Sequence, residues 1–274
     1  MLNKSMATSE EIPRTFNRSA NITRDTAEGS AKPNYSFSNS SIDLIDLVLD
    51  AATHKNADKA ISVVGPYGSG KSMFGVLLSE LARNPDSSWV QSALVGLNSI
   101  APKTGQKVST AISNRELEYK VIPIIGSRGS ISISLVNALS DLCEAEDTGW
   151  ISPDFAGRVS RLVDQVMAGI IDTSEIARFY SETAKLATTA GNKGLIILID
   201  EFGQFLEHAA SVEAIDNLLL AQQLAEESSR AKDGSLLLLT FLHQSVAHYS
   251  RSGNYEQFTE WQKIQGRFRE VAFN

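Results

Sequence analysis

The sequence contains a single cysteine, Cys143, among its 274 residues. One cysteine cannot form a disulfide within the chain, which agrees with a reducing compartment. We expect Cys143 to be a core or half-buried helix residue, not a catalytic thiol, because it lies in the apolar helical context of Leu139 and Leu142. A zinc site is not expected either, because the histidines show no ligand spacing and no second cysteine is present.

Long apolar runs are also missing. No run reaches the roughly 18 residues of a membrane span, and the N-terminus lacks the apolar core of a signal peptide. We therefore expect no membrane association and a cytoplasmic location. The formal net charge of −7 argues against a general nucleic-acid binder, although a local basic patch would still allow one. With 42% hydrophobic and 21% charged residues, the remaining composition is that of an ordinary globular protein.

The composition changes near residue 40. Residues 1–40 are rich in Ser, Asn, Thr and Arg and contain few large apolar residues, which predicts a flexible N-terminal arm. Its arginines could contact a partner, but we favour a solvated tail. Residues 41–274 are expected to form one domain, and residues 150–191 within it carry the 3.6-residue apolar stripe of a helical segment.

The strongest signal is a glycine-rich string with lysine and serine at its end. The string reads Gly65, Pro66, Tyr67, Gly68, Ser69, Gly70, Lys71, Ser72. A β-branched apolar run precedes it, and apolar residues at helical spacing follow it. G-x-x-x-x-G-K-S between a strand and a helix is typical of a phosphate-binding P-loop. The alternative, a glycine turn before an ordinary helix, is less well supported because both flanking elements are present.

The residue types of this string suit polyphosphate chemistry. Glycines let several backbone N–H groups approach phosphate oxygens at a helix N-terminus. Lys71 would contact the β- and γ-phosphates, and the Ser72 hydroxyl would bind Mg²⁺.

Two carboxylates follow a second apolar run. Asp200 and Glu201 come directly after residues 194–199, whose continuous apolar character indicates a strand buried on both faces. We assign Asp200 to Mg²⁺ and Glu201 to the attacking water as a general base. The alternative is a pair of acidic residues at a helix N-terminus, where the helix dipole favours them.

The remaining pattern predicts an α/β fold. Strands are expected at residues 60–64, 120–125, 194–200 and 236–242, with a fifth beginning near residue 271. Together they predict a mostly parallel sheet of about five strands between layers of helices. Pro123 places its strand at an edge or at a bulge. Helices are expected at residues 212–228 and 255–264, whereas residues 89–98 fit helix and strand equally well.

Two further sets of polar residues are candidates for the site. His243 and Gln244 follow the strand at residues 236–242, where either could contact the γ-phosphate or the attacking water; a strand-end cap is an equal alternative. Arg267, with Arg269 as a second candidate, could reach the γ-phosphate of a neighbouring subunit. An exposed basic pair without a role is the alternative there.

Taken in order along the chain, these features resemble the nucleotide-binding core of AAA+-type ATPases. The resemblance implies a three-layer P-loop NTPase fold of the ASCE/AAA+ type, with residues 65–72 as Walker A and the Asp200–Glu201 pair as Walker B. It places the sensor-1 position at His243 or Gln244, of which we favour Gln244, and the arginine finger at Arg267. The sensor position lacks the commoner Asn or Thr. The chain also stops where the small helical lid of the family would begin, so no lid is expected.

A narrower resemblance concerns large prokaryotic ATPases of antiviral defence. It rests on Ile199–Glu207 (IDEFGQFLE), Leu242–Ser245 (LHQS) and Trp261–Phe268 (WQKIQGRF).

The expected function is Mg²⁺-dependent ATP hydrolysis coupled to conformational change or assembly, in a homo-oligomer or a larger protein complex. The expected catalytic residues are Glu201, Lys71, Arg267 and Gln244. A guanine-reading Asn-Lys-x-Asp string is absent, which favours ATP over GTP. A nucleotide-gated switch with slow turnover and a DNA-acting motor or loader are the alternatives.

Overall fold

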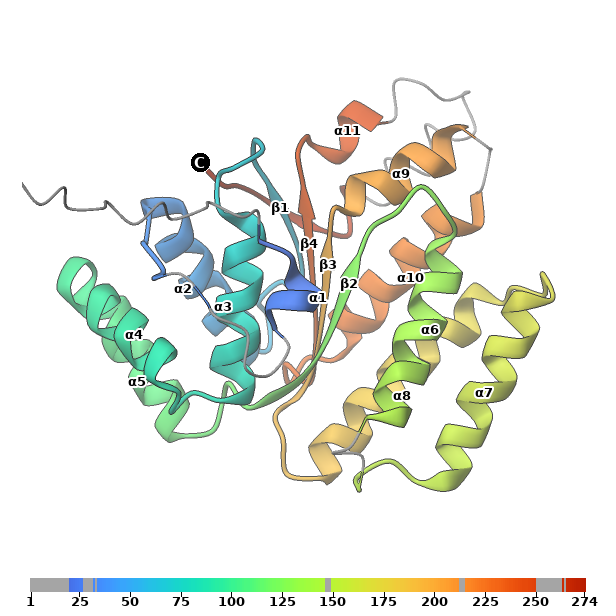
Figure 1. Cartoon of the computed structure of the whole chain (residues 1–274), viewed down its shortest axis with the longest axis horizontal. Coiled ribbons are helices and arrows are strands. Elements are labelled where there is room, and N and C mark those ends of the chain that lie inside the picture. The colour runs from blue at the N-terminus through green and yellow to red at the C-terminus, as the bar shows by residue number, and fades with distance from the viewer. Residues whose placement is uncertain are drawn as a thin grey trace, which may run out of the picture.

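The computed structural model describes residues 20–26, 32, 34–145, 149–211, 215–249, 263 and 265–274. A central sheet lies between two layers of helices, with α1 to α5 on one face and α6 to α11 on the other (Figure 1). The strands are β1 Ala60–Val64, β2 Tyr119–Ile125, β3 Gly194–Asp200, β4 Leu236–Leu242 and β5 Arg269–Ala272. The helices of the first face are α1 Ile22–Asp25, α2 Asn39–Thr53, α3 Lys71–Arg83, α4 Ser88–Ile100 and α5 Pro102–Ser113. Those of the second face are α6 Ile131–Glu144, α7 Pro153–Met167, α8 Thr173–Thr189, α9 Phe202–Ser211, α10 Ile215–Arg230 and α11 Val246–Tyr249.

The sheet is parallel throughout and has the strand order β2-β3-β4-β1-β5. Every residue of β3 and β4 is buried, because these strands lie inside the sheet and helices cover both faces. Alternate residues of β3 enter opposite layers: Ile197 packs with the α6–α11 layer, whereas Ile196 and Leu198 pack with the α1–α5 layer. The expected parallel five-stranded sheet is therefore confirmed.

Several local expectations can now be compared with the structure. Pro123 lies in β2, which is an edge strand of the sheet, as its missing N–H predicts. The ambiguous run at residues 89–98 belongs to helix α4. Residues 150–191 contain α7 and α8. The helix expected at residues 255–264 lies outside the described residues, apart from residue 263.

Helix α9 was not expected, although its sequence carries the signal for it. Phe202, Phe205, Leu206 and Ala209 recur at helical spacing, and all are buried. The helix follows Glu201 directly, so β3 passes into α9 with Glu201 as the turn between them.

The described part of the expected flexible arm is packed against the domain. Ile22 in α1 is fully buried, and its Cδ1 lies 2.5 Å from the position that a Cβ on Gly75 of α3 would occupy. The Arg83 guanidinium of α3 donates a hydrogen bond to the Thr26 carbonyl at 3.2 Å. Residues 20–26 are therefore packed on α3, because the Ile22 side chain occupies the space beside Gly75, which has no side chain. Residues 1–19 lie outside the described residues.

None of the helices in the described part of the chain is both long and apolar enough to cross a lipid bilayer.

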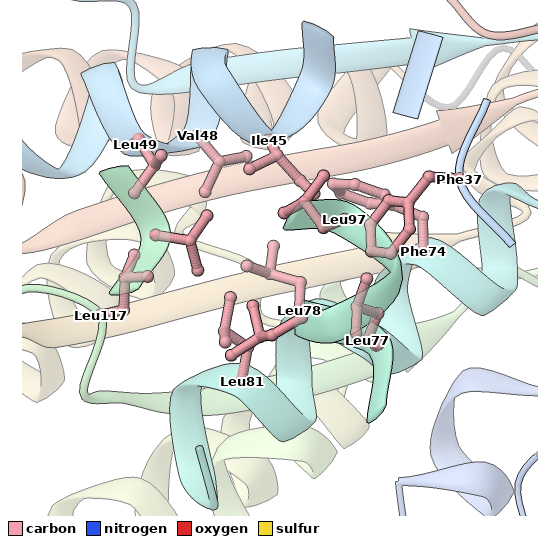
Figure 2. Close-up of a pocket in the computed structure, with 13 residues that line it drawn as sticks. Phe37, Ile45, Val48, Leu49, Phe74, Leu77, Leu78, Leu81, Leu97 and Leu117 are labelled. Atoms are coloured by element: carbon pink, nitrogen blue, oxygen red, sulfur yellow. The ribbon is translucent and has the colours of Figure 1, made fainter. Parts of the chain in front are cut away.

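A small apolar cavity lies between α2, α3, α4 and α5 (Figure 2). Its volume is about 20 Å³, and its lining includes Ile45, Val48, Phe74 and Leu97. A water molecule needs several polar partners, which this lining does not offer. The cavity is therefore an apolar gap between the helices of this layer that offers no polar partner to a water molecule.

Buried tyrosines make the stability of the fold sensitive to alkaline pH. The Tyr119 hydroxyl donates a hydrogen bond to the Gly234 carbonyl at 2.8 Å, and burial raises the pKa of Tyr119 well above its usual value. A raised folded-state pKa stabilises the fold below the unfolded pKa of about 10, and this stabilisation is lost as the pH rises further.

Tyr119→Phe removes this hydrogen bond and is therefore expected to lower the free energy of unfolding at pH 8 by about 1 kcal/mol. Above pH 10 the free energy of unfolding of the variant should also fall less steeply with pH than that of the parent. The difference in slope should be about 1.4 kcal/mol per pH unit, because the variant lacks one titrating group. Urea unfolding of both proteins between pH 8 and pH 11 measures the two slopes. Equal slopes would show that Tyr119 does not cause the alkaline loss.

Candidate functional site

The glycine-rich string forms the loop between β1 and α3 and the first two residues of α3, at the carboxyl edge of the sheet. We refer to residues 65–72 as the 65–72 loop. Its start is tied to the neighbouring strand, because the Gly65 N–H donates to the Leu242 carbonyl at 3.0 Å. Gly70, the N-cap of α3, has a φ of 96°, a left-handed conformation that favours glycine. Pro66, Tyr67 and Gly68 are exposed, so the outer side of the loop is open to a ligand.

Gly65 is required for a different reason, namely close packing. A Cβ at this position would lie 1.9 Å from the Phe273 carbonyl oxygen, which belongs to the backbone just after β5. The Phe273 N–H in turn donates to the Val64 carbonyl at 2.7 Å. The loop is thus held between the ends of β4 and β5.

Lys71, the one charged residue of the loop, is buried, with 5% of its surface exposed. Its Nζ donates to the carbonyl oxygens of Gly65 at 2.6 Å and Pro66 at 2.8 Å. Burial lowers the pKa of Lys71, and the nearby carboxylates of Asp200 and Glu201 oppose that shift. The ammonium group therefore faces the carboxylates at the end of β3 while it supports the loop.

Asp200 ends β3 and is also 5% exposed. Its carboxylate accepts a hydrogen bond at 3.0 Å from the Glu201 N–H. Burial raises the pKa of Asp200, and the nearby Ser72 side chain and the Glu201 N–H oppose that shift. Ser72 and Asp200 therefore lie near each other, even though β4 lies between β1 and β3.

The Ser72–Asp200 pair fits a magnesium ion. Mg²⁺ prefers oxygen ligands and usually takes one or two carboxylates together with phosphate oxygens and water. A hydroxyl and a carboxylate side by side meet this need. Within the described ranges no group of three or more His, Cys, Asp or Glu residues is placed to hold a metal ion, so a site built from protein ligands alone is not found there.

Glu201 lies in the turn after β3, with a φ of 52°. This left-handed conformation is uncommon for a residue with a side chain. Gly126 packs against the turn: its N–H donates to the Asp200 carbonyl at 2.7 Å, and a Cβ there would lie 2.0 Å from the Glu201 carbonyl oxygen. The backbone at Glu201 is therefore held in a strained position by its neighbour.

The Glu201 carboxylate contacts a histidine from the next strand. Its Oε2 lies 2.7 Å from Nε2 of His243, which directly follows β4. The ring of Tyr67, from the 65–72 loop, stacks on the His243 ring with centroids 3.3 Å apart and an interplanar angle of 23°. The candidate site thus contains Lys71, Ser72, Asp200, Glu201 and His243.

Gln244, which we favoured for the sensor position, is exposed beyond the end of β4. The neighbouring His243 is the residue that contacts Glu201. The register of the sheet explains this choice, because Ile199 pairs with Thr240, so the residues just beyond the two strand ends lie close together.

Arg267 lies at the amino ends of the strands, opposite the carboxyl ends where the 65–72 loop is found. It precedes β5, whose first residue Arg269 pairs with Ile61 near the start of β1. At a strand rise of about 3.3 Å per residue, Arg269 lies roughly 13 Å before Gly65 along the sheet, and Arg267 precedes the strand. Its guanidinium forms an ion pair with Glu226 of α10 at 3.0 Å. Neither Arg267 nor Arg269 belongs to the site of its own chain.

The contact among Tyr67, His243 and Glu201 was not expected from the sequence. Tyr67 occupies a variable position of the glycine-rich string, and nothing local indicates what its ring touches. The one sequence feature that pointed to the contact with Glu201 was the position of His243 directly after a predicted strand.

Comparison with protein-family models and with curated protein sequences finds no match to this chain.

Proposed function

We propose that this protein is a P-loop NTPase of the AAA+ type that binds ATP with Mg²⁺ and hydrolyses it. The carrying observation is that Ser72 and the Lys71 ammonium both lie near the Asp200 carboxylate, close enough to affect its pKa. It brings together a cradle for phosphates, a carboxylate for a cation and a positive charge, which phosphoryl transfer requires. Sequence patterns far apart in the chain thus meet at one sheet edge, where parallel α/β folds bind ligands.

In this proposal each residue has a separate task. The N–H groups of the loop and of the first turn of α3 bind phosphate oxygens, and Lys71 neutralises their charge. Ser72 and Asp200 hold Mg²⁺, which supplies charge neutralisation on the phosphates. Glu201 orients and polarises the attacking water as a general base, since its carboxylate lies next to that of Asp200. The buried position of Lys71 and Asp200 strengthens their electrostatic effect, because water screens them little.

The wild-type protein provides the direct test. We expect it to bind ATP in the presence of MgCl₂, to bind more weakly with EDTA, and to release phosphate from ATP faster than from GTP. Calorimetry and a phosphate-release assay measure these quantities. No binding of ATP at millimolar concentration would contradict the proposal. Binding followed by one turnover and retained nucleotide would favour a switch, and salt-dependent stimulation by DNA would favour a motor or loader.

We further propose that hydrolysis is coupled to conformational change or assembly of several copies, as in the antiviral-defence ATPases that the sequence resembles. The position of Arg267 supports assembly, because it is too far from its own site and half-exposed at another face. An arginine so placed could take part in hydrolysis only at the γ-phosphate of a neighbouring copy. The mass in solution with and without ATP and Mg²⁺ tests this; a monomer under both conditions would remove Arg267 from the catalytic residues.

A further inference from the structure

Three side chains connect the 65–72 loop to the carboxylate at the end of β3. Tyr67 extends from the loop and stacks on His243, and His243 contacts the Glu201 carboxylate at 2.7 Å. Tyr67 is 76% exposed, so it is not held in place by burial in the core. Its ring contact with His243 therefore stands out as the interaction that orders it.

The hydrogen-bonding capacity of His243 defines its role. An ionised carboxylate only accepts hydrogen bonds, so Nε2 of His243 must carry the proton in this contact. The other ring nitrogen, Nδ1, is buried and has no hydrogen-bond partner among the described residues. His243 is thus a hydrogen-bond donor to Oε2 of Glu201.

Glu201 needs such a donor to be aligned. Its backbone is held by the strained turn, but its side chain can still rotate about several bonds. The bond from His243 occupies Oε2 and leaves Oε1 available to accept a hydrogen bond from water. A carboxylate with one oxygen held by a hydrogen bond keeps its other oxygen in a defined position, where it can take a proton from a bound water.

We propose that His243 is the positioning residue of Glu201 and that Tyr67 holds the His243 ring in place, so that the loop that binds phosphate also aligns the base. This inference rests on the proposed function, because it concerns the same reaction. It assigns His243 a contact with the base, not with the nucleotide. It also gives Tyr67 a task that its place in a glycine-rich string does not indicate.

Pairs of variants separate the hydrogen bond from the ring stack. His243→Phe keeps an aromatic ring against Tyr67 but cannot donate to Glu201, whereas His243→Gln keeps an N–H donor. Tyr67→Ala removes the stacked ring, whereas Tyr67→Phe keeps it. A misplacement of about 1 Å can cost roughly 100-fold in rate. We therefore expect His243→Phe and Tyr67→Ala to lower kcat for ATP by about 10- to 100-fold.

The conservative variants and the double variant provide the positive signature. His243→Gln should retain most of the turnover that His243→Phe loses. Tyr67→Phe should likewise retain most of the turnover that Tyr67→Ala loses. The KM for ATP should change by less than about threefold in His243→Phe. The double variant Tyr67→Ala/His243→Phe should be about as slow as His243→Phe alone, because residues that act through one contact are not additive.

Other outcomes would overturn the inference. An unchanged kcat in His243→Phe would show that Glu201 needs no alignment by His243, and a raised kcat would show that the contact restrains the base. A raised KM with unchanged kcat would place His243 on the nucleotide instead. A wild-type protein that does not bind or hydrolyse ATP would refute the proposed function itself, and the two failures are therefore distinguishable.

Discussion

Replacing Lys71 with alanine is expected to weaken ATP binding by roughly 100-fold or more. In the nucleotide complex the ammonium would turn from the loop carbonyls to the phosphate oxygens, where two charge-assisted hydrogen bonds would be worth about 1.5–3 kcal/mol each, and the variant cannot form them. The loop also loses support, because Nζ of Lys71 donates to the Gly65 and Pro66 carbonyls. Calorimetric titration with ATP and Mg²⁺ measures the affinity, and thermal unfolding measures the accompanying loss of stability.

Lys59 offers a matched control for this experiment. It too is a buried lysine, 2% exposed, and its Nζ donates to the Ala51 carbonyl at 2.6 Å and the His54 carbonyl at 2.5 Å, at the end of α2. Lys59→Ala should therefore lower the thermal stability but leave the affinity for ATP unchanged. If Lys71→Ala still bound ATP like the parent, or if both variants lost affinity equally, the loop would not be the phosphate site.

Replacing Glu201 with glutamine is expected to lower kcat by about 10²- to 10⁴-fold, the usual contribution of a general base, while ATP still binds. Glutamine has the same shape, and its carbonyl oxygen can still accept the bond from His243, but it cannot take a proton from water. The loss should therefore concern the chemical step alone. Single-turnover hydrolysis, together with calorimetric measurement of ATP affinity, separates chemistry from binding.

Glu207 is the control for the charge of this region. It lies in α9, is half-exposed, and faces Arg128 at 3.8 Å. Glu207→Gln removes a neighbouring negative charge without touching the proposed base, so its turnover should stay within about twofold of the parent. A Glu201→Gln variant that hydrolysed ATP at the parental rate would show that the base is another group.

The parts of the molecule that the sequence predicted well are those specified by neighbours in the chain. The buried strand before Asp200 and the glycine-rich string before α3 each carry a local pattern, and the structure has a strand and a loop there. Helix α4 stayed ambiguous because a short apolar run suits either kind of element. The packing of Ile22 against Gly75 could not be predicted, since more than 50 residues separate them and neither has a local signal for the other.

The candidate site divides in the same way. The residue types at Lys71, Ser72 and Asp200 were identified from motif spacing, and the structure brings all three together. The choice of His243 over Gln244 depended on the register of β3 against β4. The position of Arg267 depended on the register of β5 against β1, which puts it at the far edge of the sheet.

The sequence by itself determined which residues are predicted to bind phosphate and a cation, because glycine spacing, a lysine and a strand-end carboxylate are local and chemically specific. Only the tertiary structure decided which side chains meet. Strand order places β4 between β1 and β3, so the end of β4 supplies the histidine that contacts Glu201. Such contacts arise from pairing between strands far apart in the chain, and no local pattern of residues encodes the register of that pairing.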